Sequence, residues 1–221
     1  MLSKNKQSFK NWNDKVENIL VYLCINRRKL ALMKRIVILA SGSGTNAENI
    51  IKYFKNHLNI KVTKVLTNNA KAKVLDRAKK LNISSSVFSR KDFYSTNSIL
   101  KILKQNADFI VLAGFLWKVP ELIINEYPNK IINIHPALLP KYGGKGMYGM
   151  HVHEAVVKHK EKESGITIHY VNNNYDEGNI IFKQKIEVLK SDTAENVAEK
   201  IHILEQKNFP KVIEKVILEH E

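Results

Sequence analysis

The segment that decides the fold class reads MKRIVILASGSGTN, residues 33–46. A charged lead-in precedes the unbroken aliphatic run 36–40, and the glycines Gly42 and Gly44 follow it. A strand in the middle of a parallel sheet is covered on both faces, so its sequence is apolar throughout instead of alternating. The segment therefore predicts a buried strand, a tight glycine turn and the start of a helix.

Helical and strand-like stretches alternate downstream of this segment. Further strands are predicted at 60–66, 87–88, 108–115 and 131–134, and helices at 47–56 (with Asn46 as N-cap), 72–81, 93–104 and 120–126. This alternation is typical of an α/β fold with a largely parallel sheet. After about residue 160 the pattern changes. The strands 165–171 and 179–189 are joined by a short turn, so we expect an antiparallel pair. A long terminal helix, 193–218, is expected to be capped by Asp192 or Ser191.

The chain of 221 residues is long enough for one sizeable core. Residues 1–32 lack the pattern described above, so we expect the folded domain to span 33–221. The first 32 residues are then either a mobile N-terminal extension or the result of a misplaced start. No apolar run reaches the roughly 18 to 20 residues that a membrane span needs. No signal peptide is recognisable, and a single cysteine, Cys24, excludes an internal disulfide and a cysteine-rich zinc site. We expect a cytoplasmic protein.

The formal net charge is +15, with 36 Lys plus Arg against 21 Asp plus Glu. Such a charge attracts polyanions, among them nucleic acid, phosphorylated metabolites and polyglutamylated cofactors. The lysines are spread along the chain, which also fits a surface that is simply solvated by lysine. We see no interleaved basic and aromatic stripe, so nucleic-acid binding is the less favoured alternative.

The turn that contains Gly42 and Gly44 is a candidate phosphate site. Backbone amides at a helix start, backed by the helix dipole, bind phosphate, and glycines allow the backbone to approach closely. The spacing also fits a dinucleotide fingerprint, but that motif needs a carboxylate about 20 residues on, where this chain has Thr67-Asn68-Asn69. The remaining alternative is a simple tight turn.

Asn133 and His135 are candidate catalytic residues because they lie two positions apart at the end of a strand. Their side chains then point to the same face, at the sheet edge where ligands gather. An amide donor beside a titratable imidazole suits acyl chemistry. Asp176, in the turn before Gly178, could reach His135 only if the loops converge. Ordinary loop residues are the alternative for all three.

Two further features receive ordinary interpretations. His151 and His153 lie about 200° apart on a helix, so they do not form a metal site, and we expect surface or helix-start histidines. The glycine-rich loop 143–149 is either a lid over a pocket or a long connector.

Three of these motifs, taken in chain order, resemble the glycinamide ribonucleotide formyltransferases: the glycine turn, the segment with Asn133 and His135, and the turn with Asp176. The matching segments are 38–46, 111–115, 133–142, 165–171 and 176–178, with 205–210 near the end. The resemblance implies a single-domain Rossmann-like formyltransferase fold: a mostly parallel central sheet, a late antiparallel strand pair and a C-terminal helix. It implies formyl transfer from 10-formyltetrahydrofolate to the amine of glycinamide ribonucleotide in purine (IMP) synthesis. No metal, nucleic acid or membrane takes part, and the protein would be a monomer or homodimer.

The resemblance also implies the site residues. Asn133, His135 and Asp176 match the catalytic trio, and Gly44, Thr45 and Asn46 match the loop that holds the substrate phosphate. Glu205 matches a carboxylate that binds the glycine end of the substrate. The pterin ring is expected at Leu112, Phe115 and Val119. Trp117 and Lys118 depart from the family pattern, as does the length of the loop 143–150.

Two related activities are the alternatives within this resemblance. A methionyl-tRNA formyltransferase is expected to carry a further C-terminal domain of roughly 100 residues. A formyltetrahydrofolate deformylase shares the trio, uses water as acceptor, and is expected to carry a regulatory domain before it. The segment 1–32 is too short for such a domain, so the glycinamide ribonucleotide activity is favoured.

Overall fold

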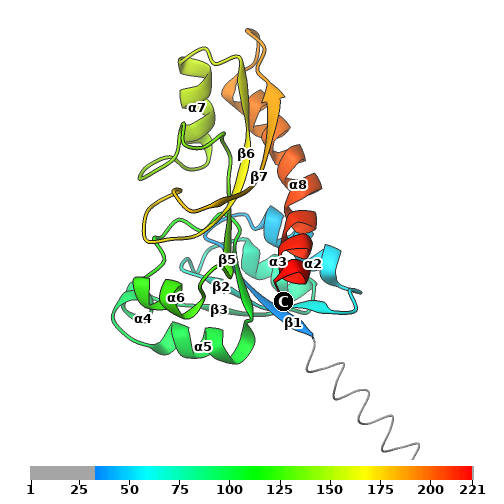
Figure 1. The fold of residues 1–221 in the computed structure, drawn as a ribbon, viewed down its shortest axis with the longest axis vertical. Helices are drawn as coiled ribbons and strands as arrows, with labels where there is room; N and C mark the ends of the chain where they lie inside the picture. Colours follow the sequence, from blue (N-terminus) through cyan, green and yellow to red (C-terminus); the bar gives the residue numbers. More distant parts are fainter. Residues whose placement is uncertain (1–32, 221) are drawn as a thin grey trace, which may run out of the picture. The chain divides into compact units, whose positions relative to one another are not determined.

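A central sheet of seven strands forms the middle of the protein (Figure 1). The computed structural model describes residues 33–220, so the expectation for residues 1–32 lies outside the described residues. The strand order is β3-β2-β1-β4-β5-β6-β7. The strands are β1 (Lys34–Leu39), β2 (Ile60–Thr67), β3 (Ser84–Val87), β4 (Phe109–Leu112), β5 (Ile131–His135), β6 (Glu163–Tyr170) and β7 (Ile180–Glu187).

The sheet is parallel from β3 to β5 and antiparallel from β5 to β7, which confirms the predicted fold class. The helices are α2 (Thr45–Phe54), α3 (Val74–Lys80), α4 (Arg90–Tyr94), α5 (Ser98–Asn106), α6 (Glu121–Glu126), α7 (Met150–Lys158) and α8 (Ala194–Glu219). No helix within residues 33–220 combines the length and apolar character that a membrane crossing requires.

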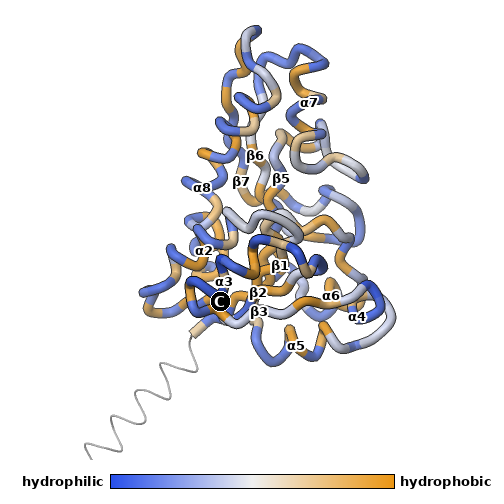
Figure 2. The backbone as a smooth tube through the Cα atoms, turned by 180° about the vertical axis from the view of Figure 1, so that it is seen from behind, coloured by the Kyte–Doolittle hydropathy of each residue, from blue (hydrophilic) through white to orange (hydrophobic). Residues whose placement is uncertain are grey.

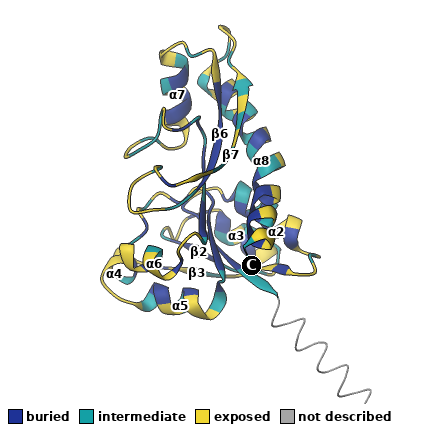
Figure 3. Cartoon of the chain, in the orientation of Figure 1, coloured by how far each residue is buried: buried dark blue, intermediate teal, exposed yellow. Residues whose placement is uncertain are grey.

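The side chains of β1 alternate between two apolar clusters. Ile36 and Ile38 belong to the cluster that α2, α3 and α8 cover, and Val37 and Leu39 to the cluster that α5 and α6 cover. Successive strand residues point to opposite faces, so a strand that is apolar throughout serves two layers of helices. Figure 2 shows these strands as hydrophobic, and Figure 3 shows them as buried between helices with exposed outer faces.

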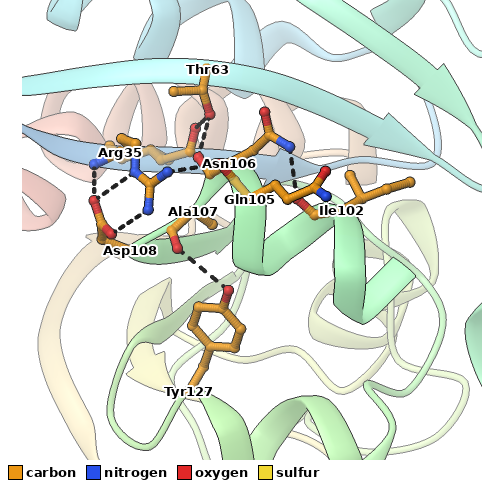
Figure 4. A network of polar contacts seen from close by, with 9 residues as sticks. Arg35, Thr63, Ile102, Gln105, Asn106, Ala107, Asp108 and Tyr127 are labelled. Carbon is orange, nitrogen blue, oxygen red and sulfur yellow. Dashed lines mark hydrogen bonds and ion pairs between the residues drawn. The ribbon is translucent and has the colours of Figure 1, made fainter. Parts of the chain in front are cut away.

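A polar network lies at the end of the sheet where the strands β1 and β4 begin (Figure 4). The Arg35 guanidinium donates to both carboxylate oxygens of Asp108, at 3.1 Å from Nε and 2.8 Å from a terminal nitrogen. Thr63, the extra residue where the β1–β2 register shifts, donates through Oγ1 to the carbonyls of Ile36 and Asn106. This network stabilises the sheet at the end opposite to the carboxyl ends of the parallel strands.

Several predicted element boundaries are wrong, for local reasons. The predicted helix 93–104 is two helices, α4 and α5, because Thr96 and Ser98 turn their hydroxyls to the Asp92 carbonyl in the break. Such local bonds compete with helix continuation. The strand predicted at 87–88 is β3, which begins at Ser84.

Both predicted helix caps are also wrong. Gly44 in a left-handed conformation, not Asn46, precedes α2. Thr193, not Asp192 or Ser191, caps α8 in a reciprocal capping box with Asn196.

Candidate active site

A cavity of about 870 Å³ opens at the carboxyl ends of β1, β4 and β5. This is the sheet edge where open α/β folds bind ligands. It brings together loops that are distant in the sequence: the turn 41–46 after β1, residues 113–116 after β4, the end of β5, the glycine-rich loop 144–149, Tyr175 and Asp176, and the α8 residues that include Glu205. The glycine-rich loop therefore forms part of the cavity wall.

The turn after β1 is built around Gly44. Its φ is +74°, and a Cβ at this position would lie 2.5 Å from the Val74 side chain, so only glycine fits. The chain then enters α2, whose first N–H groups have no partner within the helix, and the residues of this turn and helix start line the cavity. The Thr45 and Asn46 positions thus belong to a helix N-terminus, which favours an anion.

Asn46 connects this turn to the terminal helix. Its Nδ2 donates to Glu205 Oε2 at 2.9 Å, and its Oδ1 accepts from Gln206 Nε2 at 2.7 Å. Glu205 Oε2 also lies 3.5 Å from His202 Nδ1, and this contact raises the His202 pKa. The sequence predicted Asn46 as a helix cap. In the structure its amide instead holds the carboxylate of Glu205, a candidate substrate-binding residue, in place.

Pro210, inside α8, explains a second hydrogen bond between α2 and α8. Proline has no N–H, so the Gln206 carbonyl, four residues earlier, loses its helical partner. Asn49 of α2 replaces it, because its Nδ2 donates to that carbonyl at 2.8 Å. The Asn46 and Asn49 contacts, one turn apart on α2, lock it against α8 beside the cavity.

The three predicted catalytic residues meet on one side of the cavity. His135 Nδ1 lies 3.6 Å from Asp176 Oδ2, although the two residues come from β5 and from the loop between β6 and β7. Asp176 has a φ of +56° and accepts a hydrogen bond from the Gly144 N–H at 2.9 Å. Gly178 makes this loop path possible, because a Cβ there would lie 1.6 Å from the Tyr170 carbonyl oxygen.

His169 is a member of this cluster that sequence reasoning missed. Its Nε2 lies 3.1 Å from Asn133 Nδ2 and 3.7 Å from Asp176 Oδ1. Its Nδ1 lies 2.8 Å from the Tyr170 carbonyl, which can only accept, so Nδ1 carries a proton, and Nε2 is in contact with the Asn133 amide. This fixes the orientation of the Asn133 amide. The pairing of Asn133 with His169 across β5 and β6 creates the contact, and no local motif reveals that register.

The pKa values of His135 and Asp176 are both lower in this pocket than in free side chains. Burial lowers the His135 pKa, and the Asp176 charge and the Tyr142 carbonyl oppose this only in part. Burial would raise the Asp176 pKa, but contacts with His169, His135 and the Gly144 amide hold it below its ordinary value. His135 Nε2 donates to the Tyr142 carbonyl at 2.7 Å, so Nδ1 is the ring nitrogen that faces Asp176.

His153 corrects the surface interpretation of the histidine pair. It lies in the first turn of α7, but it is buried and lines the cavity, whereas His151 is exposed. Its Nδ1 has no hydrogen-bond partner within residues 33–220, and burial lowers its pKa. The local sequence did not reveal this, because α7 packs against α8, which is distant in the sequence.

The residues expected around the pterin divide into two layers. Phe115 lines the cavity, but Leu112 and Val119 are buried in the apolar cluster behind it and are not among the lining residues. Within residues 33–220 no cluster of three His, Cys, Asp or Glu side chains has an arrangement that could hold a metal.

Comparison with known proteins identifies the family. Residues 34–213 match the family model described as "Formyl transferase". The phosphoribosylglycinamide formyltransferase of Bacillus subtilis is 33% identical over 191 residues, which cover 84% of this chain and 95% of that protein. The crystal structure of phosphoribosylglycinamide formyltransferase from Anaplasma phagocytophilum is 34% identical, with a TM-score of 0.76 over 85% of this chain and 88% of that one.

Some relatives are much longer. The "Trifunctional purine biosynthetic protein adenosine-3" of Chironomus tentans is 35% identical over 81% of this chain, which spans 13% of that protein. Across four curated relatives, this chain spans between 13% and 64% of their length. From the family match, the near full-length Bacillus relative and the structural agreement, the chain belongs to the formyl transferase family, among the phosphoribosylglycinamide formyltransferases.

Proposed function

We propose that the protein transfers the formyl group of 10-formyltetrahydrofolate to the amine of 5'-phosphoribosylglycinamide, a step of de novo purine (IMP) biosynthesis. The observation that carries this proposal is the convergence of Asn133, His135 and Asp176 on a cavity that the helix-start turn 41–46 also lines. One side of this cavity suits acyl chemistry and another suits a phosphate. The family match supports the same reaction.

The acceptor would bind between α2 and α8. Gly44, Thr45 and Asn46 supply backbone amides for the phosphate, and the helix dipole favours its negative charge. Glu205, held by Asn46, binds the glycine end of the acceptor through its carboxylate. The bond between these two residues fixes the distance between the phosphate subsite and the amine subsite, so it helps to orient the amine.

The donor would bind beside Phe115. This ring forms an apolar wall for the pterin, and Leu112 and Val119 shape that wall from behind. The loop that carries Tyr175 and Asp176 forms another wall. A cavity of about 870 Å³ is within the range of small-molecule sites of about 300–1,000 Å³.

The reaction requires a neutral amine and a stabilised formyl oxygen. Attack forms a carbon–nitrogen bond and places negative charge on that oxygen; the bond to the folate nitrogen then breaks, and the proton lost by the amine goes to that nitrogen. Asn133 has two N–H donors, and since His169 takes one, the other is available for the oxygen. Protonated His135 supplies a second donor, and together they act as an oxyanion site.

Asp176 would have two roles, one in stabilising the positive charge of His135 and one in moving the proton of the amine. Its carboxylate favours the imidazolium form of His135, because it is an ionised group 3.6 Å from Nδ1. That separation exceeds direct hydrogen-bond length, so a water or the formyl oxygen can share the Nδ1 proton. Asp176 also assists the proton transfer from the amine to the leaving nitrogen through water. Holding both reactants in one cavity supplies a large part of the acceleration.

An assay of the full chain tests this function. The protein is mixed with 10-formyltetrahydrofolate, with and without phosphoribosylglycinamide, and tetrahydrofolate release is followed. We expect release that depends on the ribonucleotide, and a loss of about 100-fold or more in Asp176→Asn and His135→Ala. His151→Ala is the matched control, since this exposed histidine does not line the cavity, and it should retain normal turnover.

Two results would contradict the proposal. Equal release without the ribonucleotide would favour the deformylase reaction, in which water is the acceptor. Normal turnover in Asp176→Asn or His135→Ala, with the fold verified by circular dichroism, would remove these residues from the mechanism.

A further inference from the structure

The backbone of the segment 142–144 contacts both His135 and Asp176. The Tyr142 carbonyl accepts from His135 Nε2 at 2.7 Å, and the Gly144 N–H donates to Asp176 Oδ2 at 2.9 Å. Both contacts come from peptide groups that are only two residues apart. The position of this short backbone segment therefore decides where the imidazole and the carboxylate lie.

The backbone conformation of this segment is unfavourable by itself. Tyr142 has a φ of +58°, in the left-handed region that a bulky side chain rarely adopts. The next residue is Gly143, where a Cβ would lie 2.5 Å from the Leu139 side chain and 3.3 Å from Asp176 Cβ. A conformation of this kind persists only where its surroundings hold it, and such positions are common at functional sites. The contacts of the Tyr142 side chain supply that hold.

The Tyr142 side chain is anchored in the turn that follows α7. Its hydroxyl donates to Glu161 Oε1 at 2.9 Å and lies 3.2 Å from His159 Nδ1. The Tyr142 and His159 rings also stack, with centroids 5.8 Å apart and planes inclined by 30°. The Glu161 N–H donates to the Val156 carbonyl at 3.2 Å, which ties this turn to the last turn of α7. We refer to Tyr142, His159 and Glu161 as the Tyr142 anchor.

The hydrogen bond between Tyr142 and Glu161 is charge-assisted. Hydrogen bonds from Lys141 and from the Tyr142 hydroxyl hold the Glu161 pKa below its ordinary value, so this carboxylate is ionised at neutral pH. Burial and the same carboxylate raise the Tyr142 pKa, so the phenol keeps its proton. A hydrogen bond from a neutral hydroxyl to an ionised carboxylate is stronger than one between two neutral groups. The Lys141 side chain is 69% exposed, so its ion pair with Glu161 contributes little.

The Tyr142 anchor lies outside the cavity. None of its three residues is among those that line the cavity, so its effect on the reaction has to pass through the backbone. We infer that Tyr142 and Glu161 are positioning residues: the bond between their side chains keeps the segment 142–144 in the place from which it orients His135 and Asp176. This inference rests on the proposed function, in which these two residues act on the formyl group.

Steady-state kinetics of two substitutions test the inference. Tyr142→Phe removes the hydroxyl and keeps the ring on His159, and Glu161→Ala removes the acceptor. For each we expect kcat to fall about tenfold, because His135 loses its fixed orientation, and the KM of both substrates to stay within about twofold. Glu161→Gln keeps an oxygen acceptor for the phenol, so its kcat should lie within about threefold of the wild type. Wild-type kcat in Tyr142→Phe or Glu161→Ala overturns the inference.

Glu163→Ala is the matched control. Glu163 lies two residues further along the chain, and its carboxylate pairs with Lys185 at 3.1 Å instead of with the phenol. The substitution removes one exposed carboxylate, as Glu161→Ala does, and should leave kcat within about twofold of the wild type. An equal loss of kcat in Glu163→Ala and Glu161→Ala would assign the effect to surface charge and overturn the anchor.

An NMR titration of the His135 ring separates this inference from the proposed function, since it requires no catalysis. Burial lowers the His135 pKa most and His169 lowers it further, whereas Asp176, the Tyr142 carbonyl and Glu205 raise it. Tyr142→Phe leaves all of these side chains in place except the phenol. If the carbonyl moves away from the ring, the titration of His135 shifts to lower pH.

The titration has two outcomes, each read in protein whose fold is verified by circular dichroism. A shift to lower pH in Tyr142→Phe that is absent in Glu163→Ala supports the anchor, even if no formyl transfer occurs and the proposed function fails. An unchanged titration in Tyr142→Phe overturns the anchor, and formyl transfer by the same protein then leaves the proposed function intact.

Discussion

His135 is subject to two opposing influences within one small pocket. Burial lowers its pKa, and the Asp176 carboxylate at 3.6 Å raises it, with burial the larger effect. In the free protein the ring is therefore mainly neutral near neutral pH, and the donor form that the mechanism needs depends on Asp176. A carboxylate that lies beside a buried imidazole is thus both an electrostatic partner and a participant in proton transfer.

This balance predicts a shift in the His135 titration. Asp176→Asn removes the charge that favours the imidazolium, so the His135 pKa should fall further below its ordinary value. NMR titration of the ring resonances measures it. His202, whose raised pKa depends on Glu205, is the internal control and should be unaffected. An unchanged or increased His135 pKa in Asp176→Asn would show that the two groups are not coupled.

At the scale of elements, the site depends on how α2 is fastened to α8. Asn46 holds Glu205, and Asn49 satisfies the Gln206 carbonyl that Pro210 leaves without a helical partner. Together these contacts join residues more than 150 positions apart in sequence, 159 for Asn46 and Glu205. The candidate phosphate turn at the start of α2 and the Glu205 carboxylate on α8 are therefore held together by direct hydrogen bonds between these helices.

The Asn49 contact predicts a coupling between two substitutions. Asn49→Ala should destabilise the fold by about 1 to 3 kcal/mol, because it leaves a carbonyl without a partner. Pro210→Ala restores an N–H to the helix, so Asn49→Ala should cost less in the Pro210→Ala background. Urea unfolding of the four proteins in this double-mutant cycle measures the difference. Equal costs in both backgrounds would mean that Asn49 does not replace the missing bond.

Over the whole molecule, the cavity histidines make stability depend on pH. His135 and His153 have pKa values below the ordinary 6.5, so the folded protein binds fewer protons than the unfolded chain as the pH falls below that value. Their contribution to stability is present above pH 6.5 and is lost toward acid. His202 acts in the opposite direction, because its pKa is raised and its contribution is present at low pH.

The lowered pKa of His153 predicts how its removal changes the pH dependence of stability. The free energy of unfolding of the wild type should decrease between about pH 7 and pH 5, and His153→Gln should reduce that decrease, since it removes one buried imidazole that must stay neutral. Urea unfolding at several pH values measures this. His151→Gln, an exposed change on the same helix, serves as control and should follow the wild type. A decrease in His153→Gln as large as in the wild type would contradict the prediction.

The sequence by itself determined the fold class and the positions of most elements. These elements show local patterns: the aliphatic runs at 36–40 and 109–113, the glycine turn and the late strand pair. Whether one face or both faces of an element are buried determines how its apolar residues are spaced, so the sequence alone indicates the element. The motifs also led to the family. The site roles of Asn133, His135, Asp176, the turn and Glu205 stay predictions, as does the domain boundary at residue 33.

Only the tertiary structure decided which groups meet. His169 reaches Asn133 because β5 and β6 pair in one register, and Asp176 reaches His135 because the loop after β6 folds back over Gly143 and Gly144. The use of Asn46 to hold Glu205 and the burial of His153 depend on contacts between distant segments. Local sequence records which face of an element is apolar, but register and loop convergence follow from the packing of the whole chain, so they leave no local pattern.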